Sequence, residues 1–203
     1  MGDSMSLRRG FAAGFLAGLI QMAYLYYFAA PLAESLHEQL ATEPEEEYAQ
    51  WAAVLTAGIS GGLWGVLLAY ISERLGILTG AMLSFTAFSL LPGLKWLPTP
   101  HGVSYVEPVW WREVVHGVYL LYNFIWLYLL ALGRSSRFVI HSAALAVLGF
   151  AALPSFTLPE KYIPYFPELR ALQGLALTSW ALFWGTVAAG LYLTSPIKRP
   201  WRL

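Results

Sequence analysis

The sequence is poor in charged residues and has no cysteine. Only 12% of its 203 residues are Asp, Glu, Lys or Arg, about half the ~25% of a soluble domain. The absence of cysteine excludes disulfides, thiolate metal sites and cysteine nucleophiles. Twelve basic and twelve acidic side chains cancel, so no excess of positive charge indicates a nucleic-acid partner.

Apolar residues make up 58% of the chain and gather in six segments. About 20 helical residues, each rising ~1.5 Å, cross the ~30 Å hydrocarbon core of a bilayer. The pattern predicts an all-α, polytopic helix bundle in the cell membrane, with residues 1–203 forming a single transmembrane domain. The expected helices cover residues 10–32, 51–71, 77–91, 114–132, 138–153 and 172–193.

The charged side chains divide unequally between the two ends of such a bundle. Eight of the twelve basic residues fall on the side that holds both termini. The positive-inside rule therefore predicts that the N-terminus and the C-terminus both face the cytoplasm. Ten of the twelve acidic residues, from Glu34 to Glu168, fall on the other side. Acidic residues do not set orientation, so this second asymmetry suggests a functional outer surface.

Two of the expected helices carry glycines at four-residue spacing. This spacing of small residues lets membrane helices approach closely. We expect the two helices to pack on each other or on a helix of a partner. The glycines are Gly10, Gly14 and Gly18 in the first helix, and Gly58 with Gly62 and Gly61 with Gly65 in the second.

One stretch, residues 90–102, closes the third apolar segment with three prolines and a lysine. Pro92 is expected to end or kink the helix near the outer interface. Pro98 and Pro100 would keep the following loop extended. Lys95 has two interpretations: its ammonium group reaches water or lipid headgroups as an interfacial anchor, or it helps to shape an outer vestibule.

Histidines and glutamates on the same side form a candidate metal site. Imidazole and carboxylate groups together suit divalent ions such as Co²⁺ or Ni²⁺. Two sets have the i, i+3 or i, i+4 spacing that places residues on one helix face, and the two faces could meet around one ion. The alternative is a solvated acidic loop with helix-capping glutamates. The candidate ligands are Glu34, His37, Glu38, His101, Glu113 and His116.

The expected helix centres contain almost no ionisable residues, which argues against a proton path within this chain. The sequence also has no P-loop, no serine–histidine–acid pattern and no redox motif. We therefore expect no enzyme activity and no permanently bound cofactor; Co²⁺ or Ni²⁺ would bind only transiently.

Several short motifs, in this order and spacing, resemble the CbtA family of cobalt-transporter membrane subunits. They are Leu7-Arg8-Arg9-Gly10 before the glycine-rich helix, Leu91-Pro92-Gly93-Leu94-Lys95-Trp96 with its proline-rich sequel, Leu153-Pro154, Tyr165-Phe166-Pro167, and Leu169-Arg170 entering a last helix with Trp180 and Trp184. The resemblance extends over nearly the whole chain. One departure is Ala30-Pro31, which stands where Glu-Pro is usual in the family.

The resemblance implies a small helix bundle linked to cobalt uptake, acting with a one-helix partner that carries a histidine-rich end. The positions that correspond to the family's outer-loop motifs are Lys95, Pro98, Pro100, Arg112, Pro167 and Arg170. The expected function is thus a membrane subunit of a divalent-cation uptake system with an acidic and histidine-bearing outer vestibule. The alternative is a non-catalytic structural subunit of a larger integral membrane complex.

Overall fold

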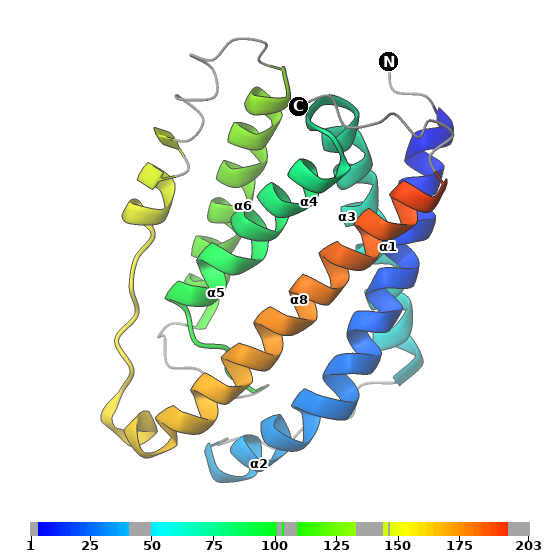
Figure 1. The fold of residues 1–203 in the computed structure, drawn as a ribbon. Helices are drawn as coiled ribbons and strands as arrows, with labels where there is room; N and C mark the ends of the chain where they lie inside the picture. Colours follow the sequence, from blue (N-terminus) through cyan, green and yellow to red (C-terminus); the bar gives the residue numbers. More distant parts are fainter. Residues whose placement is uncertain are drawn as a thin grey trace.

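The computed structural model describes residues 4–40, 50–100, 103, 109–132, 144–145 and 147–194. All regular secondary structure in these ranges is helical, which confirms the all-α class (Figure 1). Five helical stretches are long and apolar enough to cross a membrane, as expected of a multi-pass membrane protein. They are Ser6–Leu40, Trp51–Leu75, Ile77–Lys95, Trp110–Leu130 and Glu160–Thr194.

The first crossing is a continuous helix made of α1 (Ser4–Tyr24), the π-helical segment η1 (Leu25–Ala29) and α2 (Ala30–Leu40). It extends well beyond residue 32, where the sequence predicted its end. The third crossing has the same order of segments: an α-helix, α4 (Ile77–Phe85), then the π-helical segment η2 (Thr86–Leu90), then α5 (Leu91–Lys95). A proline follows each π segment at the second α position, Pro31 and Pro92.

Of the two alternatives predicted for Pro92, that it ends the third helix or that it kinks it, the first is wrong, because the helix continues to Lys95. A proline has no backbone N–H, and its ring clashes with a carbonyl one turn earlier. In the wider π turn the Leu91 N–H bonds to the Thr86 carbonyl. The next carbonyl in that register, Ala87 O, would need the N–H that Pro92 lacks. Instead, Asn123 Nδ2 of a neighbouring helix donates to it at 3.0 Å.

The second crossing, α3 (Gln50–Leu75), turns tightly into α4 at Gly76. Gly76 has φ +84°, a left-handed conformation that ends many helices and that favours glycine. Its N–H donates to Ser72 O at 2.9 Å, and its own carbonyl accepts from the Gly80 N–H at 2.9 Å. The chain therefore reverses at this single residue, without a longer loop.

α1 and α3 pack backbone to backbone along their glycines. A Cβ atom built on Gly14 would lie 2.1 Å from the carbonyl oxygen of Gly61, and one on Gly65 would lie 2.0 Å from that of Gly10. Gly58 and Gly62, the other predicted pair, instead lie against the rings of Phe15 and Phe11. Gly18 approaches the carbonyl of Ala57. The glycines of both helices are thus used within the chain.

The last two long helices are α6 (Val109–Leu132) and α8 (Phe166–Thr194), and the 3-10 segment η3 (Glu160–Tyr165) leads into α8. α8 begins six residues before the position expected from sequence, residue 172. The N-terminal end of α1 and the C-terminal end of α8 lie at the same end of the bundle (Figure 1). Between α6 and α8, the described residues 144–145 and 147–159 return across the bundle toward η3 (Figure 1).

This return is the expected helix 138–153, of which residues 138–143 and 146 lie outside the described part. Residues 147–152 are helical, and residues 154–159 form an extended segment that reaches η3. The helix ends well before the start of α8 (Figure 1), because Pro154 restricts Leu153 to extended backbone. The described part of this crossing is thus half helix and half extended chain.

The interior of the bundle is aromatic. Trp184 of α8 is 2% exposed and packs near Phe88 of η2 and Trp64 of α3, with ring centroids 6.4 and 5.9 Å away. Its indole N–H donates to Ser89 Oγ at 3.0 Å. The outer faces expose large apolar side chains, among them Leu63, Val118 and Leu193. Such a surface suits lipid, which forms no hydrogen bonds to it.

Candidate functional site

Several helix ends gather at one end of the bundle, which we call the α5 end. It comprises α2, the last turn of α5, the first turns of α6, η3 and the first turns of α8 (Figure 1). All the described residues that the sequence assigned to a metal site or a vestibule lie on these segments or on the chain after α5. The geometry of this end decides what those residues do.

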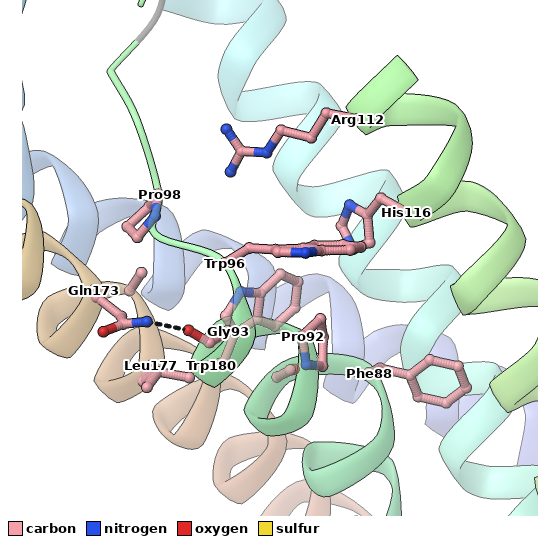
Figure 2. Close-up of a pocket in the computed structure, with 12 residues that line it drawn as sticks. Phe88, Pro92, Gly93, Trp96, Pro98, Arg112, His116, Gln173, Leu177 and Trp180 are labelled. Atoms are coloured by element: carbon pink, nitrogen blue, oxygen red, sulfur yellow. Dashed lines mark hydrogen bonds between the residues drawn. The ribbon is translucent and has the colours of Figure 1, made fainter. Parts of the chain in front are cut away.

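The backbone is not helical after Lys95, and this leaves carbonyl groups without helical partners. Such groups are costly to bury among apolar helices. Gln173 Nε2 of α8 donates to the carbonyl of Gly93, as Figure 2 shows. Arg112 of α6 donates from NH2 to the carbonyl of Leu97 at 2.9 Å and from NH1 to Thr99 Oγ1 at 3.0 Å. Side chains of two other helices therefore hold the extended segment in place.

Backbone carbonyls at and after the end of the short helix 147–152 also accept hydrogen bonds from side chains of another segment. Lys95 Nζ donates to the carbonyl of Phe150 at 2.9 Å and lies 5.0 Å from the centroid of its ring. A cation at the C-terminal end of a helix also interacts favourably with the helix dipole. Trp96 Nε1 donates to the carbonyl of Pro154 at 2.9 Å. Lys95 thus contacts a neighbouring helix end, which neither of its two sequence interpretations included.

The start of α8 joins the same network. Arg170 is exposed, donates to Gln173 Oε1 at 2.7 Å and lies 5.0 Å from the centroid of the Phe166 ring. Gln173 is 5% exposed and connects Arg170 to α5. Gln173 was not predicted as a site residue, because its only signal in the sequence is a single amide in a predominantly apolar helix.

A cavity of about 200 Å³ lies between the third crossing, α6 and α8. Four residues that the sequence singled out line it: Pro92, Pro98, Arg112 and His116. Other vestibule candidates lie elsewhere at the α5 end. Lys95 and Arg170 make the contacts given above, Pro100 is buried and accepts a hydrogen bond from the Val103 N–H at 3.2 Å, and Pro167 is exposed in the first turn of α8.

The candidate metal ligands divide between two helices. Glu34, His37 and Glu38 lie on α2, which packs on α8 and η1. Glu113 and His116 lie on α6, which packs on α3 and η2.

The structure does not bring these residues together as one metal site. Within the described ranges no three His, Asp or Glu side chains are close enough to hold a metal. The remaining candidate, His101, lies outside the described residues.

His116 contacts an aromatic residue rather than a carboxylate in the described part of the site. Its ring lies edge-on to Trp96, with 5.5 Å between the ring centroids. Trp96 also packs against Phe156 and Tyr119, with centroids 5.7 and 6.4 Å away. The indole therefore connects α6 to the chain before η3, and His116 stands at the edge of this aromatic cluster.

Comparisons of the chain with protein-family models, with curated proteins and with solved structures find no significant match in any of the three. Function must therefore be inferred from the residues and geometry described above.

Proposed function

We propose that the chain is the membrane subunit of a divalent-cation uptake system, with cobalt as the favoured ion, and that the α5 end faces the outside of the cell. One observation carries the proposal. Three of the stretches that resemble the CbtA family, 91–96, 153–154 and 165–170, lie together at one end. Trp96 donates to Pro154, and Arg170 is connected to Gly93 through Gln173. Motifs that are distant in sequence thus form one structural unit.

The distribution of charge supports this orientation. At the opposite end the described charged residues are Arg8, Arg9, Glu73 and Arg74. Over the whole sequence eight of the twelve basic residues fall on that side, so the positive-inside rule favours the cytoplasm for it. The described charged residues of the α5 end are four basic ones, Lys95, Arg112, Lys161 and Arg170, and five acidic ones, Glu34, Glu38, Glu113, Glu160 and Glu168. On α2 the described charged residues are acidic, Glu34 and Glu38, and a local excess of carboxylates would favour the capture of cations.

The chain would collect the ion rather than complete its coordination alone. The described residues provide no group of three metal ligands. The most buried polar side chains in the described interior are neutral, namely Ser84, Ser89, Asn123, Gln173 and Ser179. Further ligands would come from the loops outside the described residues or from a one-helix partner with a histidine-rich end. The ion would then cross the membrane at the interface with that partner.

Cobalt accumulation by intact cells tests this proposal. The triple variant Glu34→Gln, His37→Ala, Glu38→Gln removes the metal-binding groups of α2, whose side chains are exposed or half-buried. We expect several-fold lower accumulation at an unchanged amount of protein in the membrane. The matched control is Glu160→Gln, Glu168→Gln, which removes exposed carboxylates from η3 and α8 at the same end. Normal accumulation in the α2 variant, or an equal loss in the control, would contradict the site.

A second candidate function, a non-catalytic structural subunit of a larger membrane complex, is favoured by a different observation. The polar side chains of the α5 end that could serve chemistry, Lys95, Arg112 and Gln173, donate to backbone carbonyls of the chain itself. If this function is correct, the chain co-purifies in mild detergent in a fixed ratio with defined subunits, and its deletion leaves cobalt accumulation unchanged.

A further inference from the structure

The first crossing leaves one backbone carbonyl without a helical donor. In η1 the Ala30 N–H bonds to the Leu25 carbonyl, so the next carbonyl in this register is that of Tyr26. Its donor would be the N–H of the following residue, which Pro31 lacks. A carbonyl group without a donor is costly among apolar helices and lipid. The Tyr26 carbonyl is therefore an acceptor that needs a donor from another segment.

The third crossing has the same gap in its hydrogen bonds and shows how a neighbouring helix closes it. There the equivalent carbonyl, that of Ala87, accepts from Asn123 of α6, a helix that packs on η2. In the first crossing no side chain of the described residues donates to the Tyr26 carbonyl. The amide of Gln21 on α1 donates to Ser179 Oγ of α8 instead, at 3.3 Å. Within the described part of the chain, η1 thus has no counterpart of Asn123.

A groove of about 410 Å³ lies beside this carbonyl, and Tyr26 is one of its lining residues. Tyr26 is 60% exposed, so the groove opens on the outer surface of the bundle. Small residues on α1, η1, α2 and α3 form much of the lining, and they leave the helix backbone accessible to a close neighbour. They are Gly18, Ala29, Ala30, Ala33 and Ala57.

The first turns of α3, next to this groove, are not packed on any side. Residues 53–56 are all exposed, and four consecutive residues pass around a whole helical turn. Trp51 is 69% exposed. α1 packs on α3 as far as Gly18 and Ala57, whereas α2 packs on η1 and α8. The apolar start of α3 therefore offers a second free surface beside the groove.

We propose that a transmembrane helix of a partner protein occupies this groove, and that a neutral polar side chain of that helix, such as asparagine, donates to the Tyr26 carbonyl. A lipid acyl chain would fill the same volume, but it has no donor for the carbonyl. The volume of about 410 Å³ is more than twice the ~150 Å³ of an engineered cavity that binds benzene, so more than one side chain fits. Both candidate functions require a partner in the membrane, and the inference does not depend on cation uptake.

Binding of designed transmembrane peptides to the full chain in phosphatidylcholine vesicles tests the proposal. Each peptide is a leucine and alanine helix with one asparagine, placed at successive turns in a set so that one member matches the depth of Tyr26. The control peptides have leucine in place of asparagine. Energy transfer to a fluorophore on Thr194→Cys, at the far end of α8, measures binding. We expect saturable binding, with an affinity about threefold to tenfold higher for the matching asparagine peptide than for its control, as one hydrogen bond between membrane helices predicts.

Pro31→Ala separates the hydrogen bond from the shape of the groove. The new N–H gives the Tyr26 carbonyl a donor from the chain itself, so the asparagine peptide should lose its advantage over the leucine peptide. Pro92→Ala is the matched control, because the Ala87 carbonyl already has a donor. In that variant the advantage of the asparagine peptide should remain.

Two further variants test the groove itself. Ala30→Leu fills it and should weaken the binding of both peptides, whereas Ala12→Leu, at an exposed position of α1 outside the groove, should not. The proposal is overturned if asparagine gives no advantage, if the advantage persists in Pro31→Ala, or if a folded Ala30→Leu protein binds as the unmodified chain does. It is also overturned if no peptide binds and Ala30→Leu abolishes self-association of the chain, since a second copy would then occupy the groove.

Discussion

Lys95 shows how a single polar side chain acts in this chain. Its ammonium group lies at the end of helix 147–152, where a bond to the Phe150 carbonyl satisfies a group that no helix turn reaches. Trp96, Arg112 and Gln173 each do the same for another backbone carbonyl. In an apolar bundle a carbonyl group without a hydrogen-bond donor costs several kcal/mol of stability. These donors therefore hold the non-helical segments in place.

Replacing Lys95 by methionine tests this role. Lys95→Met keeps the length of the side chain but leaves the Phe150 carbonyl without its donor. Because Lys95 is half-buried, we expect a loss of about 1–2 kcal/mol, toward the low end for a hydrogen bond to a charged group. Thermal unfolding of the purified protein in detergent measures the change.

The matched control for that measurement is Lys161→Met. Lys161 also lies over an aromatic ring, 4.7 Å from the centroid of Tyr162, but it is exposed on η3. We expect its replacement to leave the unfolding temperature nearly unchanged. An equal shift in both variants would mean that the contact with the ring, rather than the bond to the carbonyl, stabilises this region.

The roles of these residues could be predicted only in part from the sequence. Lys95 and Arg112 stand out as basic residues next to apolar runs, so their selection was possible. Their partners are the backbone carbonyls of Phe150, near a helix end, and of Leu97, on the extended segment after α5. No side-chain pattern identifies such groups. Gln173 was missed for the same reason, because a single amide in a helix forms no motif.

At the scale of whole helices, the glycine spacing of α1 and α3 did predict a close approach. The register within that approach was open, because α3 carries two overlapping glycine pairs. The structure places Gly61 and Gly65 against the backbone of α1, and Gly58 and Gly62 against phenylalanine rings. The choice depends on which face of α3 is turned toward α1, and this is set by the packing of the whole bundle.

Gly14→Ala tests the close packing of the two helices. The new methyl group would lie 2.1 Å from the carbonyl oxygen of Gly61, so the helices must separate. We expect destabilisation of about 1–3 kcal/mol, as for other overpacked interfaces. Gly185→Ala on α8 should have the opposite sign, since a Cβ there meets nothing within 4 Å and alanine favours a helix by about 0.5–1 kcal/mol. Detergent unfolding curves that show equal shifts for the two variants would contradict this interface.

The π-helical segments explain why neither helix ends at its proline. Each helix passes through its proline because the preceding π turn changes the hydrogen-bond register. In the third crossing Asn123 supplies the missing donor to the Ala87 carbonyl. Asn123 lies on α6, 36 residues further along the chain. A local rule for proline cannot include a donor that only the tertiary structure brings close.

At the scale of the whole molecule, long apolar runs identify membrane helices because a bilayer requires them. Five of the six expected segments correspond to helices of sufficient length and hydropathy. The remaining one, residues 138–153, was less predictable because its crossing continues as the extended chain 154–159. Lys95, the last residue of α5, and Trp96, which follows it, donate to the backbone carbonyls of Phe150 and Pro154.

The proposed cation capture requires the α5 end to face outward, so the orientation of the chain is the most direct test. Because the sequence contains no cysteine, a single introduced cysteine is a unique label. Thr157→Cys places a thiol on the exposed chain before η3, and Thr194→Cys places one at the exposed C-terminal end of α8. Treatment of intact cells with a membrane-impermeant maleimide should label Thr157→Cys, and should label Thr194→Cys only after permeabilisation. The reverse pattern would place the acidic end in the cytoplasm and contradict outward-facing capture.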